Sequence, residues 1–399
     1  MQQYDLTIVG AGIIGLSIAH RFMQEQPGIR IVILEREGQI NRHQTGRNSG
    51  VIHSGIYYRK GSYKSKNCLE GYRLMLQFLQ EQNLPYKITG KAIVATNEKE
   101  TAALQKLYDN ALSCGLKVSY MEQSDLRKMQ SGLQGEKAVW VPETGITNYS
   151  LVAERLLQLL KAGGAEIVYS SGLQNVMATN GGYEIQAGSQ RFFTKLIVNA
   201  AGLQSDRVYK TITGKKSPVT IVPFKGEYYK LKPGFYQSEI PIYPVPNPDF
   251  PFLGIHITRM LDGTVKLGPN AVLVLDRHAY EKFGFNWNDA LTTVSTAGLY
   301  KVIFKYGKTA FNELLKQTSK EYFKQSVQKY WKDFDWEMVN GYTSGIRAQA
   351  INQNGLVDDF VYEVAENQIH ILNAPSPAAT SCFAIANQAY EFYRNQATV

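Results

Sequence analysis

Residues 10–15 (GAGIIG) constrain the fold more than any other part of this sequence. They carry three glycines in the GxGxxG spacing, follow an apolar run at 5–10 and open a helical pattern that extends to about Gln26. The first glycine permits a tight turn, the second lets the backbone approach a pyrophosphate, and the third allows close helix–strand packing. A second apolar run at 29–34 completes a strand–helix–strand unit. This context predicts a dinucleotide-binding fold.

An acidic residue stands where this fingerprint requires one. Glu35 ends the second apolar run, roughly 20 residues beyond Gly15, where a carboxylate accepts hydrogen bonds from ribose hydroxyls. The N–H groups at the start of the helix favour a bound phosphate. We predict cofactor contacts from Gly10, Gly12, Ile14, Gly15, Glu35 and Arg36. These residues alone leave FAD and NAD both open as the ligand.

Length and charge narrow the class of protein. With 399 residues, the chain exceeds what one hydrophobic core usually organises, which predicts two domains. The formal net charge of +9 fits an anionic substrate or an anionic membrane surface. Nucleic acid is the least favoured partner, because the sequence has no compact Lys/Arg block and no nucleic-acid fold signature.

Cysteine usage and hydropathy predict the location. Cys68, Cys114 and Cys382 are widely spaced and odd in number, which fits neither a disulfide framework nor a metal pair. We therefore expect a reducing compartment and no metal site. No apolar run is long enough to cross a bilayer, and the first strand begins too early for a leader peptide. The expected location is the cytoplasm, with the inner face of the cell membrane as an alternative.

Longer motifs carry a resemblance to a known family. The first is 43–58 (HQTGRNSGVIHSGIYY), and 222–229 (VPFKGEYY), 251–256 (PFLGIH), 267–272 (LGPNAV), 345–349 (GIRAQ), 356–360 (LVDDF) and 373–380 (NAPSPAAT) follow in the same order. With them the chain resembles, over essentially its whole length, the L-2-hydroxyglutarate dehydrogenase/oxidase family. This family is FAD-dependent and related to D-amino-acid, glycine and sarcosine oxidases. The departures are Lys225 in place of Arg, the bulkier 381–383 (SCF), and 276–342, which matches little.

The resemblance implies an α/β (α+β) fold with two domains. One is an FAD-binding Rossmann-like nucleotide domain, and the other is a β-sheet substrate domain, as in D-amino-acid and glycine oxidases. We expect a discontinuous FAD-binding domain from 1–85, 145–215 and 340–399. The expected substrate domain comprises 86–144 and 216–339, with the isoalloxazine between the two domains.

The same resemblance implies most of the cofactor contacts. The 45–53 loop would run beside the flavin pyrophosphate and ring, 199–202 would form a second strand–turn at the cofactor, and 374–380 would wrap the pyrimidine end. The implied contacts are Thr45, Gly46, Asn48, Ser49, Gly50, Val51, Ile52, Ala201, Gly202, Ala374, Pro375, Ser376, Pro377, Ala378, Ala379 and Thr380.

Oxidation of a 2-hydroxy acid needs a base for the hydroxyl proton while a hydride leaves the α-carbon. Of six histidines, only His53 and His256 lie in segments that the resemblance places at the flavin. His256 shares a predicted strand face with Gly254 and Thr258, and it is our first candidate, with His53 second. The alternative for either is a hydrogen-bonded structural histidine.

Carboxylate recognition needs cations. Arg347 resembles the carboxylate-binding arginine of the related amino-acid oxidases, and a guanidinium matches a carboxylate in shape. Arg259 and Lys225 are candidates for the distal carboxylate, although both also fit surface salt bridges. Hydroxyl contacts are expected from Tyr57, Tyr58 and Tyr228, with packing as the alternative role for the first two.

A basic aromatic stretch at about 290–332 has two interpretations. Its lysines are Lys301, Lys305, Lys308, Lys316, Lys320, Lys324, Lys329 and Lys332, and its aromatics are Tyr300, Phe304, Tyr306, Phe311, Tyr322, Phe323, Tyr330 and Trp331. Such a pattern suits a peripheral membrane helix. It equally suits a helical layer that packs its aromatics on its own domain.

The sequence therefore predicts FAD-dependent oxidation of L-2-hydroxyglutarate to 2-oxoglutarate by hydride transfer, with quinone or oxygen accepting the electrons. One alternative is oxidation of another small 2-hydroxy acid, an amino acid or glycerol phosphate. The two histidines favour an alcohol, because a neutral amine can lose a hydride without a histidine base. A different class, a regulatory nucleotide-binding module, fits the full set of flavin motifs poorly.

Overall fold

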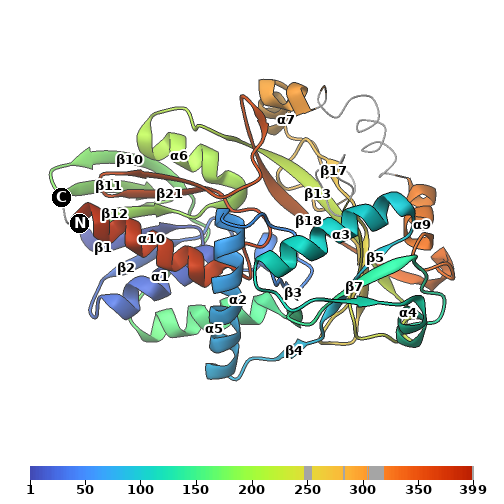
Figure 1. Cartoon of the computed structure of the whole chain (residues 1–399). Helices are drawn as coiled ribbons and strands as arrows, with labels where there is room; N and C mark the ends of the chain where they lie inside the picture. Colours follow the sequence, from blue (N-terminus) through green and yellow to red (C-terminus); the bar gives the residue numbers. More distant parts are fainter. Residues whose placement is uncertain (247–253, 282–283, 303, 305–318, 398–399) are drawn as a thin grey trace.

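The first of two large sheets holds the glycine-rich turn. The computed structural model describes residues 1–246, 254–281, 284–302, 304 and 319–397, and shows two lobes (Figure 1). The strands of the first sheet are β1 (Gln2–Val9), β2 (Ile31–Leu34), β9 (Glu166–Val168), β10 (Leu173–Thr179), β11 (Gly182–Ala187), β12 (Gln190–Asn199), β20 (Val361–Ala365) and β21 (Gln368–Asn373). They run in the order β10-β11-β12-β1-β2-β9, and β21 joins the second half of β12 and pairs with β20.

Helices cover both faces of this sheet, which is why β2 (IVIL) is apolar throughout. Helices α1 (Ile13–Glu25), α5 (Tyr149–Ala162) and α10 (Cys382–Ala397) pack on one face, where Ile31 and Ile33 point. Helix α6 (Ser205–Thr213) packs on the other, beside Val32 and Leu34 (Figure 1). β1, β2, β9, β21 and the second half of β12 are parallel to their neighbours in the sheet core, as expected of strands buried on both faces.

The second sheet forms the other lobe. Its strands are β5 (Lys91–Ala95), β6 (Ser119–Met121), β7 (Lys137–Val141), β13 (Thr220–Leu231), β14 (Ile242–Pro244), β15 (His256–Arg259), β16 (Val265–Gly268), β17 (Val272–Leu273), β18 (Val339–Asn352) and β19 (Gly355–Leu356). The order is β19-β18-β13-β16-β15-β14-β5-β7-β6, with β17 beside β13. Strands β13 and β18 pair antiparallel over almost their whole length.

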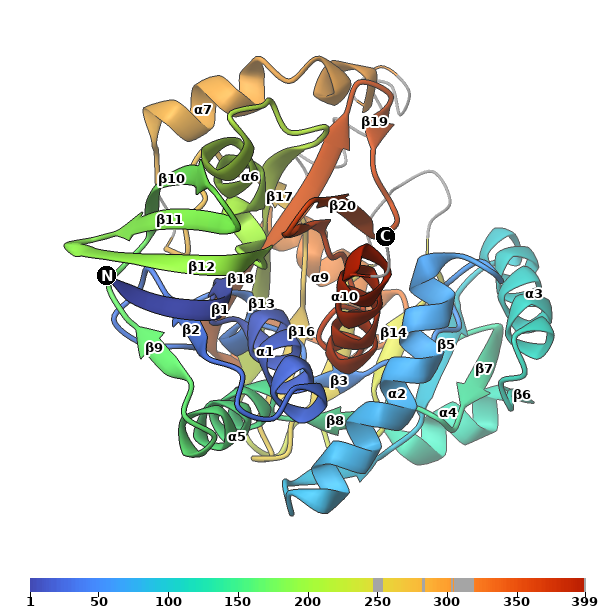
Figure 2. The same cartoon turned by 90° about the vertical axis from the view of Figure 1, so that its left-hand side faces the viewer.

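Shorter elements complete the two lobes. A three-stranded sheet consists of β3 (Val51–Ile52), β4 (Tyr86–Ile88) and β8 (Gly145–Thr147). The remaining elements are helices α2 (Tyr63–Glu81), α3 (Glu98–Ser113), α4 (Gln123–Met129), α7 (Trp287–Val294) and α9 (Lys320–Gln328), with 3-10 turns η1 (Gln44–Gly46), η2 (Gly202–Gln204) and η3 (Trp336–Met338). Figure 2 shows α2 beside α10 and α3 near the strands of the second lobe. No described helix is both long and apolar enough to span a bilayer.

The expected domain boundary at residue 340 does not coincide with a change of sheet. Strands β18 and β19 lie within the expected nucleotide-binding range 340–399, yet they run in the second sheet. The physical reason is the long ladder between β18 and β13, which ties 339–352 to 220–231. Only from β20 onward does the chain return to the first sheet.

The end of the basic aromatic stretch, residues 319–332, packs on its own lobe, whereas Tyr300 and Phe304 earlier in the stretch are exposed. Phe323 of α9 is buried with Tyr330 and Trp331 in the core beneath the second sheet, while Lys324 pairs with Asp335. Phe323, Tyr330 and Trp331 are thus core residues, as in the second of the two interpretations. Lys305, Tyr306, Lys308, Phe311 and Lys316 lie outside the described residues, as do positions 251–253 of the PFLGIH motif.

Candidate functional site

Two glycines of the fingerprint are required by the backbone itself. Gly10 has φ +109°, and a Cβ there would stand 2.6 Å from the carbonyl oxygen of Ala200. A Cβ on Gly15 would lie 2.0 Å from the carbonyl oxygen of Gly10, so α1 could not approach β1 as it does. At Gly12 a Cβ would meet only Thr45 Oγ1, at 3.5 Å. The fold therefore does not require glycine at position 12, and the missing side chain leaves room for a ligand.

The turn is held by two side chains that the sequence placed near it. The Glu35 carboxylate accepts hydrogen bonds from the N–H groups of Ala11 and Glu37, both at 3.0 Å. Thr45 Oγ1 accepts from the Ile13 N–H at 3.0 Å, at the first turn of α1. The loop that begins at Thr45 is thereby fixed against the helix N-terminus, where the backbone favours an anion.

A cavity of about 360 Å³ opens at this turn. Predicted residues in its lining are Gly10, Gly12, Glu35, Arg36, Thr45, Ala201 and Gly202. Lining residues that the sequence did not indicate include Arg42, His43, Gln44, Ser171, Arg207 and His278. These residues come from four separate parts of the chain, and the sequence analysis assigned none of them to the cofactor site. The cavity is thus a concave site at the turn where a dinucleotide is expected to bind.

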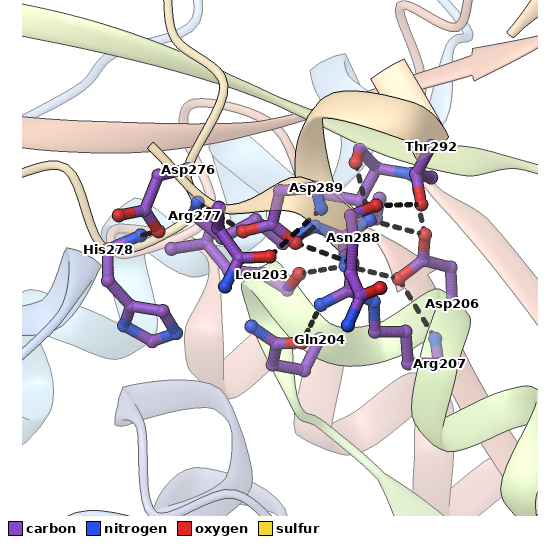
Figure 3. A network of polar contacts seen from close by, with 12 residues as sticks. Leu203, Gln204, Asp206, Arg207, Asp276, Arg277, His278, Asn288, Asp289 and Thr292 are labelled. Atoms are coloured by element: carbon purple, nitrogen blue, oxygen red, sulfur yellow. Dashed lines mark hydrogen bonds and ion pairs between the residues drawn. The ribbon is translucent and has the colours of Figure 1, made fainter. Parts of the chain in front are cut away.

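A buried ion-pair network holds the segment after residue 275, which matches little of the family, beside the cavity (Figure 3). Arg277 is 1% exposed, and its guanidinium donates to both carboxylate oxygens of Asp206, at 2.6 and 2.8 Å. It also donates to the carbonyls of Leu203 and Ile221, each at 2.7 Å. The next residue, His278, lines the cavity. A segment from the second lobe thus contributes to the dinucleotide end of the site.

Glu37, His43 and His278 come together at the rim of the same cavity. Their ligand-type atoms lie within 4.8 Å of one another, a proximity that the sequence did not predict. His43 Nε2 lies 3.0 Å from Glu37 Oε1, and the Arg36 guanidinium lies 2.8 Å from His278 Nε2. A guanidinium on the imidazole competes with any cation, so these contacts describe a hydrogen-bonded cluster.

The remaining predicted residues of the 45–53 loop shape its path. Asn48 donates to the carbonyls of Gln44 and Thr45 and accepts from the Gly50 N–H, which closes the loop on itself. Gly50 has φ +68°, and Val51 and Ile52 are buried in β3. Of the other predicted contacts, Gly46 packs against the Asn41 carbonyl, Ile14 of α1 packs on the core of the first lobe, and Ser49 is partly buried.

The 374–380 turn lies against this loop. Thr380 Oγ1 accepts from the His53 N–H at 3.1 Å and lies 2.8 Å from the Tyr149 hydroxyl, so the two predicted segments meet. Ser376 is hydrogen-bonded to the Tyr58 hydroxyl. Ala374, Ala378 and Ala379 pack on the core of the first sheet, with Pro375 and Pro377 between them.

A second group of polar side chains lies where the two lobes meet, and we call it the polar cluster: Lys91, Tyr243 and His256 are buried, and His53, Tyr57, Tyr228 and Arg347 are partly buried. Burial lowers the pKa of His256 to about 3, and the Arg347 and Lys91 charges add to the shift. Burial likewise lowers the pKa of His53 to about 3, with Lys91 and His256 contributing. Both imidazoles are therefore neutral at physiological pH and able to accept a proton.

Several atoms of the polar cluster are buried without a protein partner. Among the described residues they include His53 Nδ1, His256 Nε2 and the hydroxyls of Tyr57 and Tyr243. An unpaired buried polar atom is costly, and natural proteins leave such atoms mainly where a ligand or water completes them. The cluster thus has the chemistry of a site for a polar ligand.

Arg347 of β18 pairs with Phe224 and Tyr228 of β13 pairs with Thr343 in the β13–β18 ladder, and the Arg347 and Tyr228 side chains are hydrogen-bonded to each other. Burial raises the pKa of the Tyr228 phenol. The sequence placed these residues in one site, and the fold brings them to the same face near His256.

Arg259 and Lys225, the two candidates for a distal carboxylate, bond elsewhere. The Arg259 guanidinium donates to the Tyr236 carbonyl at 2.9 Å, and the Lys225 ammonium donates to the Glu281 carbonyl at 3.0 Å. Lys225 is buried and also lies 3.7 Å from the Glu227 carboxylate, so it does not form a surface salt bridge. Neither residue contributes a charge to the pKa shifts of His53 or His256, whereas Lys91 affects both.

Lys91 and Tyr243 are the members of the polar cluster that the sequence did not indicate. Lys91 opens the otherwise apolar strand 91–95 (KAIVA) directly after Gly90, and a lone lysine in a buried strand is the signal that could have drawn attention to it. Tyr243 stands in a short strand between prolines, with no pattern that sets it apart from the other tyrosines.

Comparison with known proteins agrees with this geometry. The sequence model of the "FAD dependent oxidoreductase" (DAO) family matches residues 5–391. An L-2-hydroxyglutarate dehydrogenase from Indibacter alkaliphilus is 40% identical over 98% of both chains. A mitochondrial L-2-hydroxyglutarate dehydrogenase from Caenorhabditis elegans is 38% identical over 97% of this chain and 92% of the relative.

Solved structures share the fold. An L-α-glycerophosphate oxidase from Mycoplasma pneumoniae, with FAD bound, superposes with a TM-score of 0.79 at 19% identity, covering 99% of this chain and 95% of the other. A glycine oxidase from Geobacillus kaustophilus gives a TM-score of 0.75 at 15% identity over 99% of this chain and 96% of the other. At such identities the likeness concerns the architecture alone.

Proposed function

This chain belongs to the FAD-dependent oxidoreductases and, within them, to the L-2-hydroxyglutarate dehydrogenase family, and we propose that it oxidises L-2-hydroxyglutarate to 2-oxoglutarate. The observation that carries the proposal is the pair of buried neutral histidines, each with a partnerless nitrogen, beside the Lys91 and Arg347 cations. Such a group suits an anionic substrate whose hydroxyl must lose a proton.

FAD fits the residues present. The glycine turn leaves room at Gly12 for a pyrophosphate, Glu35 stands at the ribose position, and the cavity continues along the 199–202 turn. The residues that would hold the adenine dinucleotide part are Gly10, Gly12, Glu35, Arg36, Thr45, Ala201 and Gly202. The 48–52 and 374–380 segments would adjoin the isoalloxazine, because the first connects Thr45 in the cavity lining to His53 and the second is hydrogen-bonded to His53 and Tyr58.

The bound flavin supplies the two-electron oxidation by accepting a hydride. The protein positions the substrate and accepts the proton. Arg347 binds the carboxylate next to the reacting carbon, and His256 Nε2 takes the hydroxyl proton, with His53 Nδ1 as the alternative acceptor. Tyr57, Tyr58 and Tyr228 line the same region, and Tyr228 holds the Arg347 guanidinium in place. The partnerless polar atoms of the cluster are themselves buried, which would limit the access of water to the reacting carbon.

The test is anaerobic reduction of the purified yellow protein. Addition of L-2-hydroxyglutarate is expected to bleach the oxidised flavin band, whereas the D enantiomer leaves it unchanged. Bleaching by glycine, D-amino acids or glycerol phosphate, but not by L-2-hydroxyglutarate, would contradict the proposal and favour another oxidation in the same fold.

A membrane quinone is the proposed electron acceptor, with oxygen as the alternative. The supporting observation is an exposed apolar face on α7, where Trp287 and Leu291 are 73% and 64% exposed. Exposed apolar side chains together with a net charge of +9 suit contact with an anionic bilayer. We expect the parent protein to co-sediment with phosphatidylglycerol vesicles. The double variant W287S/L291S should no longer do so. Equal sedimentation of the parent and variant would exclude this face.

A further inference from the structure

Lys91 is the one buried lysine without an acceptor among the described parts of the chain. Three lysines are buried there: Lys64, Lys91 and Lys225. Lys64 pairs with Asp358 at 2.6 Å, and Lys225 is bonded to the Glu281 carbonyl and faces Glu227. Lys91, 1% exposed at the start of β5, forms no ion pair or hydrogen bond through its ammonium with the residues described.

Two aromatic faces and a thiol lie near the Lys91 ammonium. It stands 4.3 Å from the ring centroid of Tyr57 and 5.1 Å from that of Tyr243. Cation–π contact offsets only part of the cost of removing an ammonium from water. Cys68 supplies no counter-charge, since burial raises the pKa of its thiol to about 12. The ammonium is thus a buried positive charge that the protein alone does not neutralise.

The position of Lys91 relative to the histidines points to a role in binding. Its charge acts on both His53 and His256, while the charge of Arg347 acts on His256. His256 therefore lies between two cations that come from different strands, β5 and β18. A substrate with two carboxylates and a hydroxyl between them would match two cations with a base between them.

We propose that the Lys91 ammonium binds the carboxylate farther from the reacting carbon and thereby selects dicarboxylates over monocarboxylates. The inference rests on the proposed oxidation of a 2-hydroxy acid at the polar cluster. It adds the residue that determines which 2-hydroxy acids are preferred. No covalent step is involved. Lys91 acts as the counter-charge for an anion that arrives with the substrate, which also explains why the protein tolerates the charge unpaired.

The experiment compares K91M with the parent holoenzyme on two substrates of equal chain length. L-2-hydroxyglutarate carries the distal carboxylate, and L-2-hydroxypentanoate has a methyl group there. In K91M we expect kcat/KM for the diacid to fall on the order of 10²-fold, while that for the monoacid stays within about 3-fold. An equal fall on both substrates, or no fall on either, would overturn the proposal.

Thermal unfolding separates a binding role from a structural one. Removing an unpaired buried ammonium is expected to raise the Tm of K91M at pH 7, because nothing in the protein loses a partner. A structural lysine would lower it. A lower Tm together with an unchanged preference for the diacid would count against Lys91 as the anion receptor.

Two control variants sharpen the comparison. K64M removes a buried lysine that has an acidic partner, and K225M removes the lysine that the sequence had suggested for the distal carboxylate. Neither is expected to change the ratio of diacid to monoacid kcat/KM. A change in that ratio with K225M but not K91M would transfer the role to Lys225.

A binding measurement without turnover keeps this inference distinct from the proposed function. Glutarate and pentanoate are titrated into the oxidised holoenzyme while the flavin absorbance is followed. We expect K91M to bind glutarate more weakly than the parent does and to bind pentanoate with unchanged affinity. If the parent shows this preference for glutarate but L-2-hydroxyglutarate does not reduce the flavin, the proposed reaction fails and the anion receptor stands. Equal affinities of the parent for both acids would overturn the receptor itself.

Discussion

The imidazole of His256 lies flat against the phenol ring of Tyr243, with centroids 4.1 Å apart and planes 9° from parallel. The stacking fixes the ring plane, and His256 Nδ1 is 3.3 Å from the Gly254 carbonyl oxygen. A proton on Nδ1 would be held by that carbonyl, which leaves Nε2 as the free acceptor. Tyr243 therefore positions the candidate base through its ring.

Replacement of the base tests this assignment directly. H256N is expected to slow flavin reduction by L-2-hydroxyglutarate by roughly 10² or more, because the hydroxyl proton has lost its acceptor. The visible spectrum of bound flavin should not change. Stopped-flow measurement beside H53N decides between the two histidines, and a normal rate in H256N with a slow rate in H53N would reverse their roles.

The pH dependence of kcat/KM should show no acid limb from these histidines near pH 6.5. Their pKa values are lowered by burial to about 3, so both stay neutral, and able to accept a proton, as pH falls from 8 to 5. Steady-state rates across that range provide the measurement. A loss of activity with a midpoint near 6.5 would mean that the base is a solvated histidine instead.

An alkaline limb is expected from Lys91. Burial lowers its pKa to about 7, so in the free protein the ammonium is present below pH 7 and is lost as the pH rises above it. Tyr57 and Cys68, which face it, have raised pKa values and stay neutral in this range. The kcat/KM for the diacid should therefore decline above about pH 7 in the parent but not in K91M. A parallel decline in both proteins would assign the limb to another group.

Arg347 should affect substrate affinity rather than cofactor retention. R347M removes the planar donor that binds the proximal carboxylate, and we expect kcat/KM to fall on the order of 10²–10³-fold with FAD still bound. The flavin-to-protein absorbance ratio checks retention. Unchanged kinetics would remove Arg347 from the site, and loss of flavin would indicate that it supports the fold.

The fingerprint glycines should separate folding from cofactor binding. G10A forces a positive φ on alanine and places its Cβ 2.6 Å from the Ala200 carbonyl oxygen, which should cost about 1–3 kcal/mol or more. In G12A the added Cβ makes only an ordinary van der Waals contact with Thr45 Oγ1. This variant should therefore fold normally and bind FAD weakly. Denaturant unfolding and FAD titration measure the two effects, and equal behaviour of both variants would contradict this division.

Much of the first lobe could be predicted from the sequence, for a physical reason. The turn, helix and strands at 5–34 depend on local backbone requirements and on burial of short apolar runs, which residue type alone displays. The expected helix at 13–26 is observed at Ile13–Glu25, and the expected turn after residue 373 leads into α10. The family resemblance, carried by long ordered motifs, supplied the cofactor and the reaction class.

Only the tertiary structure decided which side chains share a site. Lys91 joins the histidines because β5 lies next to β14, a pairing between residues about 150 positions apart in sequence. His278 reaches the cavity because its neighbour Arg277 is paired with buried Asp206, in a segment that matches little of the family. Arg259 and Lys225 were candidates for the distal carboxylate because they are cationic. In the structure, both donate hydrogen bonds to backbone carbonyls of neighbouring segments. Local sequence determines backbone conformation and burial, whereas the partner of a buried charge depends on contacts between distant strands.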